Sequence, residues 1–366
     1  MPQAELWMGA YPGFSSNVVF AHRRESLNEL IHAAPVHVLG ERVVAEYGSD
    51  LPFLFKLLAA ERPLAIQAHP NLQQAQHGYH NEENAGTPLD SPERCFRDQN
   101  HKPEIICALS DFHLLVGLRP ATEIVNRIER IDSTVLERAR SAIQRDPTGE
   151  GVLRALKDIY DAPEASLRRS IDRVVEYATN VKNQQSDWKW IPRMHHFYPY
   201  DVGILVSIFM NITSLRPGQA VYVPETRLHA FLEGTGVELQ ANSNNVLRGG
   251  LTSGYVDSGR LLEVADATCA SPELLEPNRV SDTEWAYEAP VREFRLAQIH
   301  VGPKLGHIEH ELSSIEILLC VEGEAEIETA SHESITIRKG QSVVIAAAVA
   351  SYQVRGEAVF YKASTF

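Results

Sequence analysis

The chain has 366 residues, of which 44% are hydrophobic and 22% are charged, a composition typical of a globular protein with roughly two or three domains. Its 34 basic and 48 acidic residues give a formal net charge of −14, which argues against nucleic acid or an anionic membrane as a partner. An anionic small molecule stays compatible with this charge, because a few local Lys or Arg side chains are enough to hold it.

The cysteines and the N-terminus indicate the cellular compartment of the protein. The four cysteines are far apart and form no C-x-x-C pair, so we read them as reduced, mostly apolar thiols: Cys95, Cys107, Cys269 and Cys320. The N-terminal sequence lacks the basic region of a signal peptide, and no apolar run approaches the ~20 residues of a membrane helix. We therefore expect a cytoplasmic protein without a membrane partner.

The first elements are short helices and one long loop. Ser26 and Glu29 form the pattern of a capping box, which predicts a helix through Ile31. A second helix is predicted over 41–47, followed by an apolar segment at 51–58. Residues 71–99 are polar and contain several Gly and Pro, so we predict a long loop there, and loops of that length are more often functional than idle.

Residues 64–69 predict a strand with two polar side chains on one face. The alternation sends Leu64, Ile66 and Ala68 to one side, and Gln67 and His69 to the other. An imidazole and an amide oxygen two residues apart can bind one metal ion. Such a pair is more often a simple surface pair, so the metal reading depends on ligands further along the chain.

Residues 100–109 predict a second strand that carries a carboxylate among apolar neighbours. Lys102, Glu104, Ile106 and Ala108 share one face by the same alternation. A buried carboxylate needs a cation or a metal ion as a partner. Glu104 is therefore a further candidate ligand.

The middle of the chain changes to a helical period and then returns to strands. Apolar residues recur every three or four positions from 124 to 143, which predicts one amphipathic helix, and two more helices follow up to residue 178. Strands are predicted at 212–215 and 220–224, with His229 shortly after them. A Pro-rich connector at 271–290 leads to short, closely spaced strands that indicate a sandwich or barrel, at 315–321, 325–329, 334–337, 343–347 and 358–361.

Three motifs together resemble one family. These are Q-x-H-P-N at 67–71, N-H-K-P-E at 100–104, and a Gly218, Pro224, His229 pattern typical of cupin barrels. With the N-N-V-L-R-G-G-L-T segment at 244–252, they resemble the type I mannose-6-phosphate isomerases of the bacterial kind, within the cupin superfamily. The resemblance covers nearly the whole chain and is weakest in the helical block and the C-terminal barrel.

The resemblance implies a mainly β fold with a helical insert. A double-stranded β-helix (cupin or jelly-roll) catalytic barrel is expected from residues 1–119 and 192–255, with an α-helical insert at 120–191 between its two parts. Residues 256–366 are expected to form a second, cupin-like barrel without metal ligands.

The resemblance also implies a set of site residues. One Zn²⁺ per chain is expected on four side chains: Gln67, His69, Glu104 and His229. Arg248 matches the family's catalytic arginine, and Lys102 should reach the same cavity from the face that carries Glu104. Lys56 and His101 are the candidate substrate contacts. The general base stays open between Lys102, His101 and a zinc-bound water.

The implied activity is the interconversion of D-mannose 6-phosphate and D-fructose 6-phosphate through an enediolate, for mannose catabolism or GDP-mannose synthesis. The expected partner is thus a small sugar phosphate, and the protein is expected to be a monomer. The alternative is a catalytically weak or silent sugar-phosphate-binding cupin with a regulatory role, suggested by Asn244 in place of the family's Asp. Arg248 favours the enzyme, because a pure binder has less reason to keep it.

Overall fold

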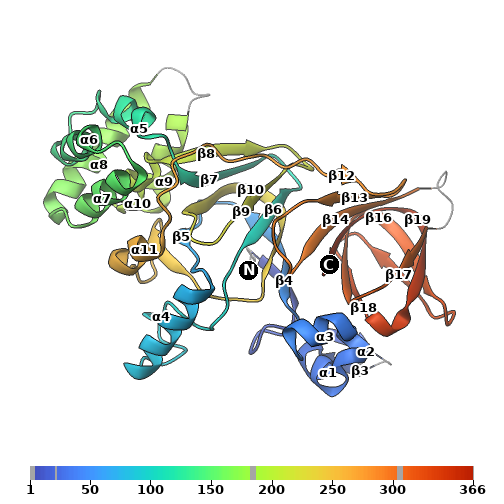
Figure 1. The fold of residues 1–366 in the computed structure, drawn as a ribbon. Coiled ribbons are helices and arrows are strands. Elements are labelled where there is room, and N and C mark those ends of the chain that lie inside the picture. The colour runs from blue at the N-terminus through green and yellow to red at the C-terminus, as the bar shows by residue number, and fades with distance from the viewer. Residues whose placement is uncertain (1–4, 21–22, 182–186, 303–307, 366) are drawn as a thin grey trace.

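The computed structural model describes residues 5–20, 23–181, 187–302 and 308–365. Figure 1 shows three parts: a β-barrel in the middle, a block of helices on one side of it, and a second β-barrel on the other side. Within the described ranges, no helix is both long enough and apolar enough to cross a membrane.

The first barrel is built from two sheets that share one long strand. One sheet has the order β1-β4-β10-β6-β9 and the other the order β11-β5-β10-β7-β8. The expected first cupin barrel is present. Its strands are β1 (Glu5–Gly9), β4 (Phe53–Ala60), β5 (Ile66–Ala68), β6 (Glu104–Ala108), β7 (Phe112–Leu118), β8 (Met210–Leu215), β9 (Ala220–Val223), β10 (His229–Ala241) and β11 (Leu247–Gly250).

Strand β10 passes from one sheet to the other near Gly234. Before this glycine β10 pairs with β7, and after it with β4 and β6. Gly234 has a φ of 128°, and a Cβ there would lie 2.7 Å from the Asp111 carbonyl oxygen. Only glycine tolerates both conditions, so this residue allows the corner that closes the barrel.

The helical block is inserted between β7 and β8. Its helices are α5 (Ala121–Ile128), α6 (Thr134–Arg145), α7 (Gly149–Tyr160), α8 (Glu164–Asn180), α9 (Trp190–Phe197) and α10 (Gly203–Ser207), with a 3₁₀ turn at Asp187–Lys189. The prediction of a single helix over 124–143 is wrong, because α5 ends at Ile128 and Ser133 caps a new helix that begins at Thr134. The Ser133 hydroxyl accepts a hydrogen bond from the Leu136 N–H at 3.2 Å.

The N-terminal segment adds a hairpin and three short helices beside the second barrel (Figure 1). These are β2 (Asn17–Phe20), β3 (Arg23–Ser26), α1 (Leu27–Ala33), α2 (Pro35–Leu39) and α3 (Glu41–Tyr47), so both predicted helices are confirmed. The predicted capping interaction of Ser26 is wrong. The Ser15 hydroxyl accepts the Asn28 N–H at 3.0 Å instead, and Ser26 donates to Ser15 at 3.1 Å.

A helix replaces much of the long loop predicted at 71–99. Helix α4 (Leu72–Asn84) begins at Asn71, whose side chain accepts the Gln74 N–H while the Gln74 side chain accepts the Asn71 N–H, both at 2.9 Å. The loop prediction is therefore wrong for the first half of the segment. The helix directly follows His69, so its reciprocal cap fixes the point where the chain leaves β5.

The second barrel follows α11 (Ser258–Val264). Its strands are β12 (Asn278–Arg279), β13 (Glu284–Tyr287), β14 (Arg295–Val301), β15 (Ile308–Glu311), β16 (Glu316–Thr329), β17 (Ser334–Arg338), β18 (Ser342–Ile345) and β19 (Ser351–Ser364). The turn predicted at Glu322 and Gly323 is wrong. There β16 runs on, and its register with β19 shifts between Cys320 and Glu322, as in a β-bulge.

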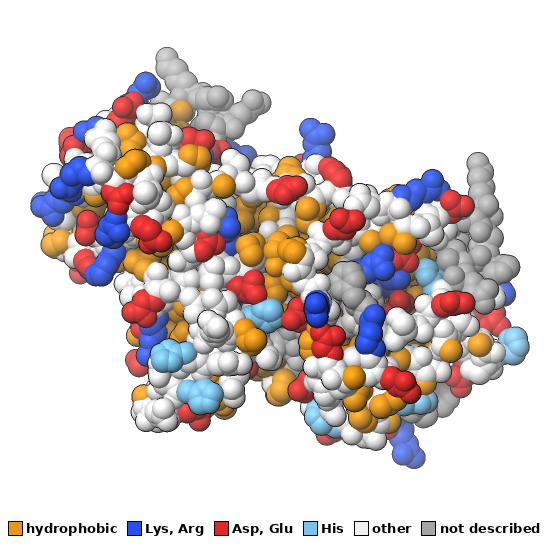
Figure 2. Space-filling view, viewed as in Figure 1, with side chains coloured by type: hydrophobic (Ala, Val, Ile, Leu, Met, Phe, Trp, Pro, Cys, Tyr) orange, Lys and Arg blue, Asp and Glu red, His pale blue; other side chains and the backbone are white. Residues whose placement is uncertain are grey.

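The two barrels share one apolar core. One buried cluster combines side chains of the first barrel, such as Phe53, Phe55 and Ile105, with side chains of the second. The latter include Phe294 and Tyr361. On the outer face in Figure 2, by contrast, acidic and basic side chains are interspersed. The interior between the barrels is therefore packed like that of a single domain.

Candidate metal centre and active site

Three strands place their polar residues on the inner face of the first barrel. In β5, Ile66 and Ala68 pack outward against the helical insert, so Gln67 and His69 face inward. In β6, Ile106 and Ala108 belong to the barrel's interior cluster, and Glu104 shares their face. The alternation predicted from the sequence is the one that the structure shows.

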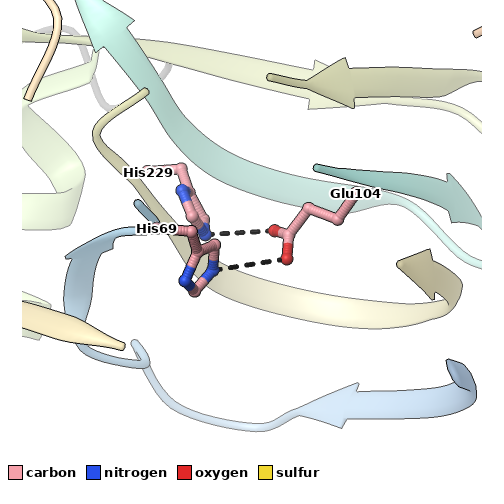
Figure 3. A group of neighbouring side chains, drawn as sticks. All are labelled: His69, Glu104 and His229. Carbon is pink, nitrogen blue, oxygen red and sulfur yellow. Dashed lines mark ion pairs between the residues drawn. The ribbon is translucent and has the colours of Figure 1, made fainter. Parts of the chain in front are cut away.

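His229 completes the group as the first residue of β10. It lies directly opposite Gln67 in the antiparallel pair of β10 and β5. Its Nε2 is 3.0 Å from Glu104 Oε1, and His69 Nε2 is 3.4 Å from Glu104 Oε2. Figure 3 shows the two imidazoles and the carboxylate pointing toward one another. The three side chains thus converge from three distant parts of the sequence.

Backbone carbonyls orient both histidines. His69 Nδ1 donates to the Asn245 carbonyl oxygen at 2.7 Å, and His229 Nδ1 donates to the Arg227 carbonyl oxygen at 2.9 Å. Each Nε2 is then left unprotonated toward the common centre, which is the usual way that a metal-binding histidine is held. Burial, and after it the charge of Lys102, lower the pKa of His69 to about 3 against the opposing effect of Glu104, so this imidazole is neutral at physiological pH.

Glu104 provides the charge of the group. It is 0% exposed, and within the described chain neither of its oxygens has a hydrogen-bond partner of good geometry. Although burial by itself raises its pKa, the nearby His229 and Lys102 hold the pKa well below the ordinary value. A buried carboxylate whose oxygens have no well-aligned hydrogen-bond donor in the described part of the chain, next to two imidazoles, calls for a cation. The ligand atoms of His69, Glu104 and His229 all lie within 4.8 Å of one another, which suits a single metal ion.

Gln67 lies beside this group. Its Nε2 is 3.2 Å from His229 Nε2. Rotating the amide by 180° exchanges its nitrogen and oxygen, which brings the carbonyl oxygen to the position from which it can bind a metal ion. All four predicted ligands are therefore brought together.

Two cationic residues border the centre. Lys102 is buried, and its Nζ lies 3.0 Å from His69 Nε2 and 3.6 Å from Glu104 Oε2. Burial lowers its pKa, although Glu104 opposes part of that effect. Arg248 lies directly opposite Gln67 in the pair of β11 and β5, so both side chains leave the same face of the sheet. In the described ranges its guanidinium makes no hydrogen bond or ion pair, which leaves it available to an anion.

The two predicted substrate contacts are already engaged. Lys56 Nζ is 3.0 Å from Glu238 Oε1 and 4.9 Å from the centre of the Trp7 ring. The His101 imidazole lies between Glu225 and Glu293 rather than in the group around Glu104. Neither arrangement brings these two residues into contact with the candidate metal ligands.

Sequence reasoning missed two residues that shape the site. Glu238 faces inward from β10 beside the outward-facing Val237 and Leu239, and the period-two alternation could have identified it. Asn245 is fully buried, and its Oδ1 accepts the N–H groups of Arg97 and Asp98 at 2.6 and 3.1 Å. Its sequence context gives no comparable signal, because the contact depends on two loops meeting in space.

Fold and site together define a metal-binding cupin that carries a helical insert and a second, fused barrel. Residues 1–121 match the family described as phosphomannose isomerase type I, catalytic domain, and residues 306–363 match the mannose-6-phosphate isomerase cupin domain. The mannose-6-phosphate isomerase of Escherichia coli K12 is 33% identical over 358 residues, covering 97% of this chain and 89% of the relative. The chain belongs to the type I mannose-6-phosphate isomerase family.

Further relatives and solved structures agree. The mannose-6-phosphate isomerase of Salmonella typhimurium is 34% identical, over 94% of this chain and 87% of the relative. The human mannose-6-phosphate isomerase is 29% identical, over 94% of this chain and 84% of the relative. A crystal structure of a zinc-bound mannose 6-phosphate isomerase superimposes with a TM-score of 0.91 at 30% identity, over 100% of this chain and 91% of the other. The fold prediction is thereby confirmed.

Proposed function

We propose that the protein is a zinc-dependent isomerase that interconverts D-mannose 6-phosphate and D-fructose 6-phosphate. The observation that carries this function is the convergence of His69, Glu104 and His229, with Gln67 beside them, in a chain of this family. Two neutral imidazoles, one carboxylate and one amide oxygen are a donor set that suits Zn²⁺. We assign one zinc ion per chain to these four residues.

The zinc ion, when bound, supplies Lewis-acid chemistry beside the sugar oxygens. We assign the proton transfer between C1 and C2 to Lys102, whose ammonium group borders the ligands and whose burial favours the neutral amine. Arg248, whose charge has no partner within the described chain, is assigned to the negative charge of the enediolate or of the phosphate.

Lys56 and His101 stay predicted substrate contacts. Lys56 keeps its positive charge, because Glu238 and Glu5 raise its pKa against the opposing effect of burial, so it can still attract a phosphate at the edge of its ion pair. His101 would have to leave its two glutamates before it could reach a ligand.

We also propose the organisation in which the enzyme works. Residues 1–119 and 192–255 form the catalytic barrel, 120–191 the insert and 256–366 the second barrel, with α9 and α10 at the border of the insert. A cytoplasmic monomer is proposed as well. The four thiols lie unpaired in the structure, in keeping with a reducing compartment.

A coupled assay of the purified chain tests the function. Formation of fructose 6-phosphate from mannose 6-phosphate is measured before chelation, after verified removal of zinc, and after zinc is added back. We expect activity to be lost and then restored. Full activity without zinc would overturn the metal assignment, and binding of mannose 6-phosphate by the zinc-loaded chain without turnover would identify a silent binding protein instead.

A further inference from the structure

His101 is held by two carboxylates from different parts of the chain. Its Nδ1 is 2.5 Å from Glu225 Oε1, its Nε2 is 2.8 Å from Glu293 Oε1, and its side chain is only 22% exposed. Burial lowers its pKa, but the hydrogen bonds to Glu225 and Glu293 outweigh burial and raise it to about 9. The imidazole is therefore a cation with both nitrogens engaged at physiological pH.

The two carboxylates belong to segments of different function. Glu225 lies between β9 and β10, in the loop that leads to His229, and the next residue, Thr226, donates its N–H to the His69 carbonyl oxygen at 2.7 Å. Glu293 lies between β13 and β14 of the second barrel. Its other oxygen accepts the Arg292 N–H at 3.1 Å, so the carboxylate itself is fixed.

Lys102 directly follows His101 in a stiff stretch of backbone. Pro103 fixes its own φ and restricts Lys102 to extended conformations. The Pro103 carbonyl accepts the Ala241 N–H at 3.1 Å, and Glu104 then begins β6. The backbone between His101 and Glu104 therefore has few free torsion angles. The contacts of His101 with Glu225 and Glu293 then determine where the Lys102 side chain points.

We propose that Glu293 is a positioning residue: through His101 it keeps Lys102 against the metal site, so the second barrel takes part in catalysis although the four proposed metal ligands all lie in the first barrel. This inference rests on the proposed isomerase function. It assigns the second barrel a task that packing alone does not require. A shift of about 1 Å in a catalytic group can reduce turnover as much as a hundredfold, so a single distant carboxylate is enough to matter.

The test compares zinc-loaded, full-length Glu293→Gln with Glu288→Gln, a matched control in the same loop whose carboxylate is exposed. For Glu293→Gln we expect kcat to fall about tenfold, with KM within about twofold of wild type and zinc content unchanged. For Glu288→Gln we expect wild-type kinetics. His101→Gln and the double variant His101→Gln/Glu293→Gln should show the same kcat. Glu293 acts only through His101, so once His101 is replaced, the loss of Glu293 has no further effect.

Three results would overturn the inference. The first is a folded, zinc-loaded Glu293→Gln variant with wild-type kcat, and the second is a raised KM at constant kcat. The third is a double variant in which the losses of kcat from the two single substitutions multiply. If Glu293→Gln does not fold, Glu293→Asp, which keeps the charge on a shorter side chain, must show a loss of kcat in the same direction. Turnover by the wild-type chain is measured first. Its absence would refute the proposed function, whereas wild-type turnover with an unaffected Glu293→Gln would refute only this inference.

Discussion

The candidate metal centre depends on how the hydrogen bonds of its side chains are distributed. Backbone carbonyls occupy the Nδ1 atoms of His69 and His229, and neither oxygen of Glu104 has a competing donor of good geometry among the described residues. A charged group in such a place is stable only with a cation beside it. The residue whose loss should matter most to zinc binding is therefore Glu104.

We expect Glu104→Gln to bind zinc weakly, because the substitution removes the only negative charge among the four ligands. The loss of zinc affinity should exceed the roughly 10- to 100-fold effect typical of an outer-shell partner. Zinc per chain after dialysis, measured by elemental analysis together with isomerase activity, checks this. Glu61→Gln, at an exposed turn, is the control and should keep its zinc; zinc retention by Glu104→Gln would contradict the ligand assignment.

His101 should make stability depend on pH in the alkaline range. Its pKa is about 9 in the folded chain against 6.5 in the unfolded one, so its contribution is complete below about pH 6.5 and is lost as the pH rises to 9. The full contribution is on the order of 3 kcal/mol or less. Urea unfolding at several pH values checks this: the free energy of unfolding of wild type should exceed that of His101→Gln at pH 6, and the difference should vanish near pH 10.

At the scale of elements, the helical insert supports the strands that carry the site. Tyr160 of α7 donates its hydroxyl to the Gly249 carbonyl oxygen at 2.6 Å, next to Arg248 in β11. Ile66 and Ala68 of β5 pack against the same block of helices. The insert thus packs against the outer face of the two strands, β5 and β11, whose inner face carries Gln67 and Arg248.

Tyr160→Phe should therefore destabilise the protein by about 1–3 kcal/mol, because the Gly249 carbonyl is left without its partner. It should also lower kcat moderately, since β11 positions Arg248. Tyr177→Phe in α8 is the control, because the Tyr177 hydroxyl makes no hydrogen bond within the described ranges. Urea unfolding and steady-state kinetics of both variants check the expectation; equal stability of the two variants would refute it.

The periodicity of the sequence predicts elements well and their ends less well. The alternation at 64–69 and 100–109 placed the ligand-bearing faces, because period two holds wherever one face of a strand packs on a core. Helix α4 was missed since its surface is mostly polar, and the break at Ser133 was hidden because apolar residues keep a helical spacing across it. The partners Glu225 and Glu293 of His101 were out of reach, because they depend on tertiary contacts.

At the scale of the whole molecule, the two barrels are joined by a common core rather than by a flexible linker. Phe53 and Phe55 of the first barrel belong to the same buried cluster as Phe294 and Tyr361 of the second. The strand spacing and the family resemblance predicted two barrels but could not show this joint core, because apolar strand faces look alike whether they pack inside one barrel or between two.

The barrels should accordingly unfold together. Calorimetry of the zinc-free chain is expected to show one cooperative transition, and Phe294→Ala, which removes a fully buried side chain at the junction, should lower its midpoint without splitting it. Phe14→Ala, at an exposed position, is the control and should leave the midpoint unchanged. Two separate transitions in wild type would contradict a joint core.

The order of the proposed zinc ligands along the chain has a consequence for biosynthesis. Gln67, His69 and Glu104 leave the ribosome early, whereas His229 follows about 125 residues after Glu104, beyond the whole helical block. At ordinary elongation rates this interval lasts roughly 6 to 25 s. A nascent polypeptide therefore spends that time with an incomplete set of the proposed donors, and we expect zinc loading to fall in the last third of translation or later.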